Sequence, residues 1–213
     1  MLNHKMYSSI VVFRQWVTFL MGNGKTTTLY LMRHGETEDN VRRVIQSHND
    51  SPLTQEGIVA TRGRAKMLKG IMFDTIFCSD LERTRKSLEI LLEKLDINID
   101  VNYCTEIREL DFGRFTGKNI EEVKETILLH KKQTWKHYPD GESGDSFSKR
   151  IIDFVENILC RYEGKAVLFM THYGVVETIL KHYVKKPDKR LNTRNYDTGV
   201  LCFNNKDVSF KWI

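Results

Sequence analysis

The chain has 213 residues, of which 40% are hydrophobic and 29% are charged, and its formal net charge is +5. This length suits one α/β domain that buries a core without disulfide bonds. The basic residues are spread along the chain, and the four cysteines lie far apart with no C-x-x-C pair. The composition therefore gives no sign of nucleic-acid binding, of a disulfide framework or of a zinc site.

The N-terminal residues differ from the rest of the chain. The segment "IVVFRQWVTFLM" (10–21) is apolar, but it has only twelve residues and contains Arg14. It is too short to span a membrane, and no signal-peptide cleavage pattern follows it. We expect residues 1–27 to be a dispensable N-terminal extension, and the alternative is an extra helix that packs on the domain.

The segment "GNGKT" (22–26) looks like the end of a nucleotide-binding P-loop. The full pattern is G-x-x-x-x-G-K-[ST], but Phe19 occupies the position of its first glycine. A P-loop also leads into a helix whose N–H groups face the phosphates. Because β-prone residues follow here, we expect a polar joint instead of a nucleotide site.

An alternation of predicted strands and helices begins at residue 28. Apolar, β-prone runs predict strands at 28–33, 72–79, 97–103 and 165–172, and a terminal hairpin from "GVLCFNN" and "VSFKW". Helical patterns fall at 54–70, 80–95, 120–135, 145–162 and 173–184. For the helix at 80, Ser79-Asp80-Leu81-Glu82 predicts a capping box. We expect residues 28–213 to form one α/β domain, a three-layer sandwich with a mostly parallel central sheet, helices on both faces and an antiparallel C-terminal edge.

Polar side chains that suit phosphate chemistry follow four of the predicted strands. Arg33 and His34 come directly after the first strand, and Arg83 lies shortly after the second. Glu106 follows the third strand, and His172 follows the fourth. Because ligands bind at the carboxyl ends of parallel strands, we expect these five groups to converge on one rim.

This set of side chains fits the hydrolysis of a phosphomonoester. Guanidinium groups match the geometry of a phosphoryl group and its charge. A neutral imidazole can attack phosphorus and form a phosphohistidine. A carboxylic acid can protonate the leaving oxygen and later accept a proton from water. Two arginines and a second imidazole can supply the positive field, so no metal is required.

Several segments resemble the histidine phosphatase superfamily, whose fold is phosphoglycerate-mutase-like, over essentially all of residues 28–213. They occur in the family's order: "LYLMRHGETEDN", "IQSHNDSPLTQEG", "FCSDLERT", "EIRELDFGRFTGK", "PDGES" and "VLFMTHYG". The resemblance implies that His34 is the phosphorylated nucleophile. It implies that Glu106 is the proton donor, and Glu109 nearby is the competing candidate.

The resemblance also implies the remainder of a substrate pocket. Arg33, Arg83 and His172 would complete the phosphate site. Asn40 and Gln46 match positions that often contact the phosphoryl group in phosphatase members. Three positions depart from the family's common residues: Ser47 replaces a glycine, Ala60 replaces a glutamine, and Tyr173 replaces the glycine after the second histidine. We expect Tyr173 to narrow the substrate pocket.

Within the family, "RHGETEDN" resembles phosphatase members, including α-ribazole phosphatases and broad-specificity phosphatases. Cofactor-dependent mutases instead carry a Gln-Ser-x-x-Asn continuation after R-H-G and a longer insertion after the proton-donor glutamate. We therefore expect a metal-independent phosphatase that acts on a small phosphorylated metabolite, with α-ribazole phosphate as one candidate. A phosphoglycerate mutase is the first alternative, and a catalytically silent binding module on the same fold is the second.

The resemblance implies no cofactor and no metal ligand. The expected partner is a small-molecule phosphomonoester, with no nucleic acid and no membrane, and a homodimer is left open. The scattered cysteines fit a reducing, cytoplasmic location. We expect His48, His130, His137 and His182 to be surface residues. Trp135 either anchors a helix or lines the substrate entrance.

Overall fold

The computed structural model describes residues 25–184, 197–204 and 207–213. Residues 1–24 of the expected extension lie outside the described residues. The described end of that segment already belongs to the domain, because strand β1 (Thr27–Arg33) begins one residue earlier than predicted and Thr26 is buried.

The helices and strands alternate as the sequence predicts. After β1 come α2 (Glu38–Arg42), α3 (Gln55–Leu68), β2 (Thr75–Ser79), α4 (Glu82–Leu95), β3 (Val101–Cys104) and a 3-10 turn η1 (Gly113–Phe115). Then follow α5 (Lys124–Lys132), α6 (Gly144–Arg161), β4 (Ala166–Thr171), α7 (Tyr173–Tyr183), β5 (Thr198–Asn204) and β6 (Asp207–Trp212). Two of these described elements were not predicted from the sequence, the short helix α2 and the 3-10 turn η1.

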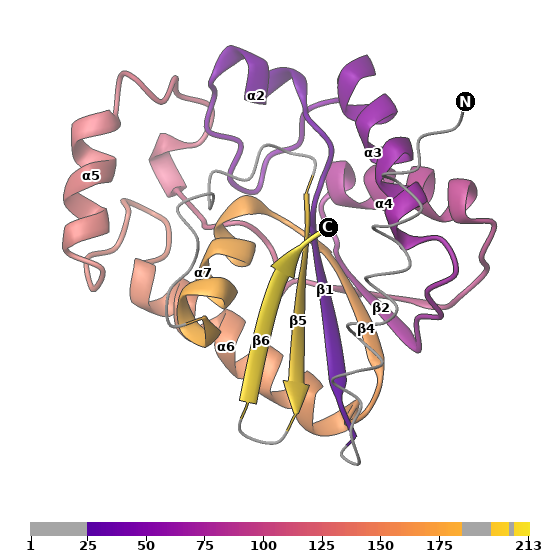
Figure 1. The fold of residues 1–213 in the computed structure, drawn as a ribbon. Helices are drawn as coiled ribbons and strands as arrows, with labels where there is room; N and C mark the ends of the chain where they lie inside the picture. The colour runs from indigo at the N-terminus through magenta and orange to yellow at the C-terminus, as the bar shows by residue number, and fades with distance from the viewer. Residues whose placement is uncertain (1–24, 185–196, 205–206) are drawn as a thin grey trace.

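The strands form one six-stranded sheet in the order β3-β2-β4-β1-β5-β6. The pairs β3–β2, β2–β4 and β4–β1 are parallel, whereas β1–β5 and β5–β6 are antiparallel. Figure 1 shows β5 and β6 side by side at one edge of this sheet, beside β1. The predicted fold, a mostly parallel sheet with an antiparallel C-terminal edge, is confirmed.

Helices cover both faces of the sheet because side chains alternate along each strand. Leu29 and Leu31 of β1 point to the face covered by α6 and α7. Tyr30 and Met32 point to the opposite face, where Leu68 of α3 and residues of α4 pack. Figure 1 shows α3 and α4 on one side of the sheet and α6 and α7 on the other. The two cores give the three-layer sandwich.

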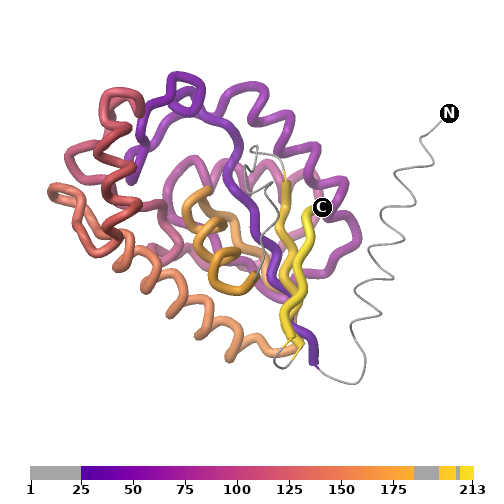
Figure 2. The backbone as a smooth tube through the Cα atoms, turned by 60° about the vertical axis from the view of Figure 1, so that its left-hand side comes forward, coloured from indigo at the N-terminus to yellow at the C-terminus, as the bar shows by residue number. Residues whose placement is uncertain are grey.

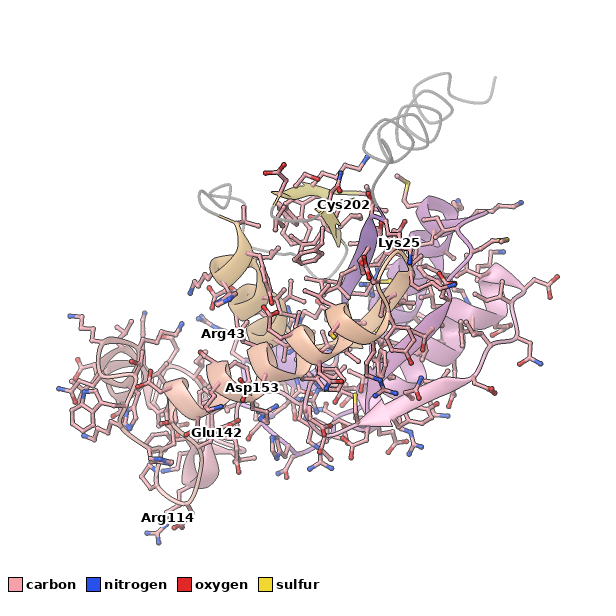
Figure 3. The ribbon with its side chains drawn as sticks, turned by 90° about the horizontal axis from the view of Figure 1, so that it is seen from below. Lys25, Arg43, Arg114, Glu142, Asp153 and Cys202 are labelled. Carbon is pink, nitrogen blue, oxygen red and sulfur yellow. The ribbon has the colours of Figure 1, made fainter. Side chains whose placement is uncertain are left out.

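Helix α6 is the longest of the described elements, and its formation follows directly from its sequence. Phe147, Ile151, Val155 and Ile158 recur at helical spacing and are buried, which is the pattern of a helix with one apolar face. Ser143 caps its first turn by accepting a hydrogen bond from Ser146 N. Figure 2 shows α6 as one long helix along the lower side of the molecule, and Figure 3 shows its outer face from below, with Asp153 labelled.

The start of α4 differs from the prediction. Its N-cap residue is Leu81, and no side chain of the expected Ser79 capping box bonds to the helix end. Asp50, from a distant loop, takes that place: its Oδ2 accepts from Glu82 N at 2.9 Å and its Oδ1 accepts from Arg83 N at 3.2 Å. The capping box is wrong because Ser79 ends strand β2 and is directed to another partner.

No helix in the part of the chain that the structure describes is long and apolar enough to cross a bilayer.

Candidate active site

Two histidines lie together where adjacent parallel strands end. Arg33 of β1 pairs with Thr171 of β4, and the next residue of each chain segment is a histidine. His34 N donates to Thr171 O at 2.9 Å, and the ring centroids of His34 and His172 are 5.3 Å apart. The register of β1 on β4 therefore brings the two imidazoles side by side, as the sequence predicted.

The His34 ring has a defined tautomer. Its Nδ1 lies 2.7 Å from Gly35 O, and because a carbonyl oxygen can only accept, Nδ1 carries the hydrogen and Nε2 keeps a free lone pair. The side chain is buried. Burial, followed by the positive charges of Arg33 and Arg83, holds the pKa of His34 well below its usual value. The imidazole is therefore neutral at physiological pH and has its Nε2 available as a nucleophile.

Close packing directly after His34 requires a glycine at position 35. A Cβ here would lie 2.8 Å from Thr61 Oγ1 and 2.9 Å from Gly57 O. Gly35 N donates to Ser87 Oγ at 2.8 Å, which fixes the peptide between His34 and Gly35, next to the peptide whose carbonyl accepts from the His34 ring. A larger residue would push this peptide away from its partners.

Arg83 is held from several sides within the protein. Its side chain is 1% exposed. Nη1 donates to Asn49 O at 2.7 Å and to Asp50 Oδ1 at 3.0 Å, and Nη2 donates to Ser47 O at 2.8 Å and to His172 Nδ1 at 3.2 Å. Its Nε is buried and has no protein partner. A guanidinium fixed in this way presents a preorganised positive charge beside His34.

The second histidine supports the first and Arg83. Because a guanidinium can only donate, His172 Nδ1 accepts, and its Nε2–H donates to Ser79 Oγ at 2.8 Å. His172 is fully buried. Burial, and then the charge of Arg83, holds the pKa of His172 well below its usual value. Ser79 thus orients the imidazole of His172, which is why it does not cap α4.

The carboxylate that lies at the same cavity as His34 is that of Glu109. Glu109 lines the same cavity as His34 and Arg83, its Oε2 accepts from Gly174 N at 3.1 Å and its Oε1 accepts from Leu110 N at 2.9 Å. Glu106 is exposed and does not line that cavity. The expectation that Glu106 converges with the other four groups is therefore wrong.

Local backbone geometry explains this difference. After β3 the chain turns tightly, with Arg108 N donating to Thr105 O at 3.1 Å, and the turn directs Glu106 to solvent. Glu109 reaches the first turn of α7, where a Cβ on Gly174 would overlap its Oε1. The N-terminal end of a helix also attracts a carboxylate. Gly174 therefore leaves the space that Glu109 occupies.

The cavity has a volume of about 690 Å³, and most of the predicted site residues line it. These are Arg33, His34, Asn40, Gln46, Arg83 and Tyr173. His172 contacts His34 and Arg83 but is not part of the cavity wall. Three of the lining residues carry a buried polar atom without a protein partner: Arg33 Nε, Gln46 Oε1 and Arg83 Nε. Such atoms suit a polar ligand.

Two of the expectations about aromatic and histidine side chains change. His130 is buried, not at the surface: it lines the cavity, and its ring stacks on Tyr138 with centroids 4.2 Å apart and an interplanar angle of 14°. Its sequence environment, a charged helix end, hides this packing. Trp135 is 68% exposed and does not line the cavity, so it is neither a buried anchor nor part of the wall. His182 is exposed and lies at the cavity.

Asp50 is a site residue that the sequence analysis missed. Its carboxylate lies at the start of α4 and pairs with Arg83. The signal available was "HND" beside "SPLT", which reads only as a polar loop. Among the described residues, no group of three or more His, Cys, Asp or Glu side chains is arranged to hold a metal ion.

Comparison with known proteins decides the family. The family model described as histidine phosphatase superfamily (branch 1) matches residues 29–208. The chain belongs to this superfamily. Among its superfamily relatives is the adenosylcobalamin/alpha-ribazole phosphatase of Escherichia coli K12, which is 25% identical over 189 residues, covering 86% of this chain and 91% of the relative.

Other members of the superfamily carry different names. "Probable phosphoglycerate mutase GpmB" of Escherichia coli O1:K1 / APEC is 29% identical over 180 residues, covering 78% of this chain and 80% of the relative. The structure of Bacillus stearothermophilus YhfR superposes with a TM-score of 0.72 at 28% identity, covering 86% of this chain and 94% of that chain. The family is therefore established, and its members include proteins named as phosphatases and as mutases.

Proposed function

We propose that this protein is a phosphomonoester hydrolase that works through a phosphohistidine at His34. The observation that carries the proposal is the state of that side chain. His34 is buried and neutral, and its Nδ1–H is committed to Gly35 O at 2.7 Å. Its Nε2 lone pair is therefore free, and His34 shares a cavity with Arg33 and Arg83.

In the first step, His34 Nε2 attacks phosphorus. The N–P bond forms as the bond between phosphorus and the ester oxygen breaks, and Glu109, in its protonated form, gives its proton to the leaving oxygen. The positive charge that develops on the imidazole is shared with Gly35 O through the Nδ1–H bond. Arg33 and Arg83 hold the phosphoryl oxygens.

In the second step, water attacks the phosphohistidine. The Glu109 carboxylate takes a proton from this water, the O–P bond forms, and the N–P bond breaks, so that the electron pair returns to Nε2. Phosphate leaves, and both His34 and Glu109 recover their starting protonation states. The contact of Glu109 with Gly174 N at 3.1 Å supports this assignment because it holds the carboxylate at the cavity.

Trapping the intermediate tests the nucleophile. Incubation with a ³²P-labelled aryl phosphate and an alkaline quench should leave label on the protein, because an N–P bond survives alkali. The label should be absent from His34→Asn and present in His137→Asn, a matched control at an exposed histidine outside the cavity. Label in His34→Asn, or its absence from the wild type during turnover, overturns the mechanism.

The two carboxylates provide a second matched pair. Glu109→Gln should lower kcat by about 10²–10⁴, the usual contribution of a positioned acid or base. Glu106→Gln should keep kcat within about twofold, because Glu106 is exposed and outside the cavity. The reverse result would return the proton-donor role to Glu106.

A phosphoglycerate mutase is the second candidate, favoured by the 29% identity to a relative of that name. With 3-phosphoglycerate and a bisphosphoglycerate primer, we expect released phosphate to exceed the isomerised product. An excess of isomer would make the protein a mutase. Activity should also persist in EDTA, and inhibition that a divalent ion reverses would refute the metal-independent scheme.

A cytoplasmic location is part of the proposal. It is supported by four free thiols, of which Cys78 and Cys202 are buried. Detection of the protein in a periplasmic or secreted fraction would contradict it.

A further inference from the structure

The cavity extends well beyond the space that a phosphoryl group needs, and many of the side chains that line it are apolar. Its total volume is about 690 Å³, which is in the range of sites for whole metabolites. The apolar and aromatic side chains that line the cavity include Val44, Leu110, Phe112, Ile127, Phe147 and Ile152. A phosphomonoester in this site would therefore place its organic body against apolar surface.

The cavity runs along helix α7, so the helix gives an estimate of the cavity's length. Tyr173 and Gly174 line it at the first turn, beside Glu109, and Lys181 and His182 line it at the last turn. Lys181 follows Tyr173 by eight positions, and His182 follows Gly174 by the same number. At a rise of 1.5 Å per residue, the cavity therefore follows the helix for about 12 Å. The phosphate end and the far end are thus separated by the length of an extended organic group.

The opposite wall also offers little hydrogen bonding to a ligand. His130 directs Nδ1 to Thr126 O at 2.8 Å and Nε2 to His137 O at 3.2 Å. Because a carbonyl oxygen only accepts, a neutral ring donates to one of these two carbonyls, and both nitrogens lie against the backbone. Tyr138, which is stacked on it, is also buried.

The cations at the far end do not form a second phosphate pocket. Lys181 Nζ lies 3.1 Å from Glu177 Oε1, and both side chains line the cavity. Lys131 is exposed at the rim. The described residues thus place buried arginines at one end only, and at the far end a second phosphoryl group would meet exposed side chains, among them the paired Lys181.

We infer that the substrate is a phosphomonoester with an extended apolar body about 12 Å long, and not a small polyanionic metabolite. Apolar contacts along the cavity select the body, and the arginines and His34 select the phosphoryl group. This inference rests on the proposed function and adds a substrate class to it.

A series of n-alkyl phosphates from ethyl to dodecyl tests the inference. Their leaving alcohols are chemically alike, so a change in kcat/KM with chain length reports burial of the chain. Each methylene should raise kcat/KM by about threefold to fourfold, the effect of burying one CH₂. The gain should stop at about nine or ten carbons, taking ~1.25 Å along the chain for each carbon from a C–C bond of ~1.5 Å.

Serine substitutions at the cavity wall provide the matched variants. Ile152 of α6 and Ile120, which is 38% exposed, line the cavity, and their partial exposure favours folded variants. Ile152→Ser and Ile120→Ser should reduce the gain in kcat/KM per methylene. Leu128→Ser should keep the wild-type gain, because Leu128 is 50% exposed on α5 and outside the cavity. An equal loss in Leu128→Ser would overturn the assignment of the wall.

The outcomes separate this inference from the proposed function. Hydrolysis with no dependence on chain length overturns the inference and leaves the phosphatase intact. If no alkyl or aryl phosphate is hydrolysed, calorimetry with n-alkylphosphonates, which have no ester bond to cleave, measures the apolar contacts directly. Affinity that rises with chain length then supports the inference while the proposed function fails, and a flat series overturns both.

Discussion

The loop residue Asp50 should control the arginine at the centre of the site, and Asp50→Asn tests this. The carboxylate accepts from Glu82 N at 2.9 Å and from Arg83 N at 3.2 Å, and it pairs with Arg83 Nη1 at 3.0 Å. Asparagine keeps the shape and remains a good helix cap. The amide nitrogen cannot accept, however, so the substitution removes the negative charge beside the guanidinium together with one of the two backbone hydrogen bonds.

The loss of stability in Asp50→Asn can be estimated from the distance between Asp50 and Arg83 and from the solvent exposure of the two side chains. Two charges 3.0 Å apart interact by roughly 5.5 kcal/mol at an effective dielectric constant of 20. Arg83 is 1% exposed, but Asp50 is 32% exposed, so solvent screens part of this energy. Taking about 2 kcal/mol as the net loss, the free energy of unfolding should fall by that amount. If the whole loss also appears in the transition state, kcat/KM should fall by about 30-fold.

Urea unfolding and aryl phosphate hydrolysis together measure both effects. The matched control is Asp74→Asn, because Asp74 is 35% exposed, pairs with Lys165 Nζ at 2.9 Å and accepts from Ala166 N at 2.8 Å. It lies at the opposite end of β4 from His172. The control should lose stability and keep kcat/KM. Wild-type kcat/KM in Asp50→Asn, or an equal loss of activity in Asp74→Asn, would refute the reasoning.

Three further predictions concern the groups around the site. The pKa values of His34 and His172 are depressed, so as the pH falls below about 6.5 the unfolded chain binds protons that the folded protein does not. Each histidine should then lower the free energy of unfolding by ~1.4 kcal/mol per pH unit. In urea titrations, His172→Gln should halve the contribution of these two histidines to that pH dependence, and an unchanged pH dependence would contradict the prediction. Ser47 has φ +51, and its Oγ accepts from a backbone N–H at 2.9 Å. Ser47→Ala should lower the free energy of unfolding by about 1–3 kcal/mol, and Ser47→Gly should lower it by about 1 kcal/mol less because glycine tolerates this φ. A lower melting temperature for Ser47→Gly than for Ser47→Ala would contradict this. Gly174→Ala should displace Glu109 and lower kcat by about 100-fold or more, whereas Gly63→Ala, with open space at its Cβ, should not; equal kinetics in the two variants would exclude the steric explanation.

Much of the architecture is predictable because periodicity carries it. The strands and the five longer helices follow from apolar runs and helical spacing, and the meeting of His34 with His172 follows from the rule that parallel strands end at one edge. Helix α2 has five residues, none of them buried, so no apolar pattern announces it. Its start is nevertheless fixed by a capping box between Thr37 and Asn40.

The errors arise where a local turn or a distant partner decides. Glu106 and Glu109 are three residues apart, and only the turn at Thr105–Arg108 determines which of them reaches the cavity. The capping motif at Ser79 is correct in sequence, but His172 competes for the serine and Asp50 supplies the cap. Neither partner is near in sequence, so no local pattern reveals the exchange.

The position of β1 in the sheet has a consequence for how the protein is made. Thr28 of β1 pairs with Ala166 on one side and with Cys202 on the other. On a ribosome, the strand that precedes His34 is therefore synthesised long before either of its neighbours. Until β4 and β5 emerge, the apolar segment Leu29–Met32 has no partners and is prone to wrong pairing with other chains. We expect this segment of the nascent chain to be the one that a molecular chaperone protects.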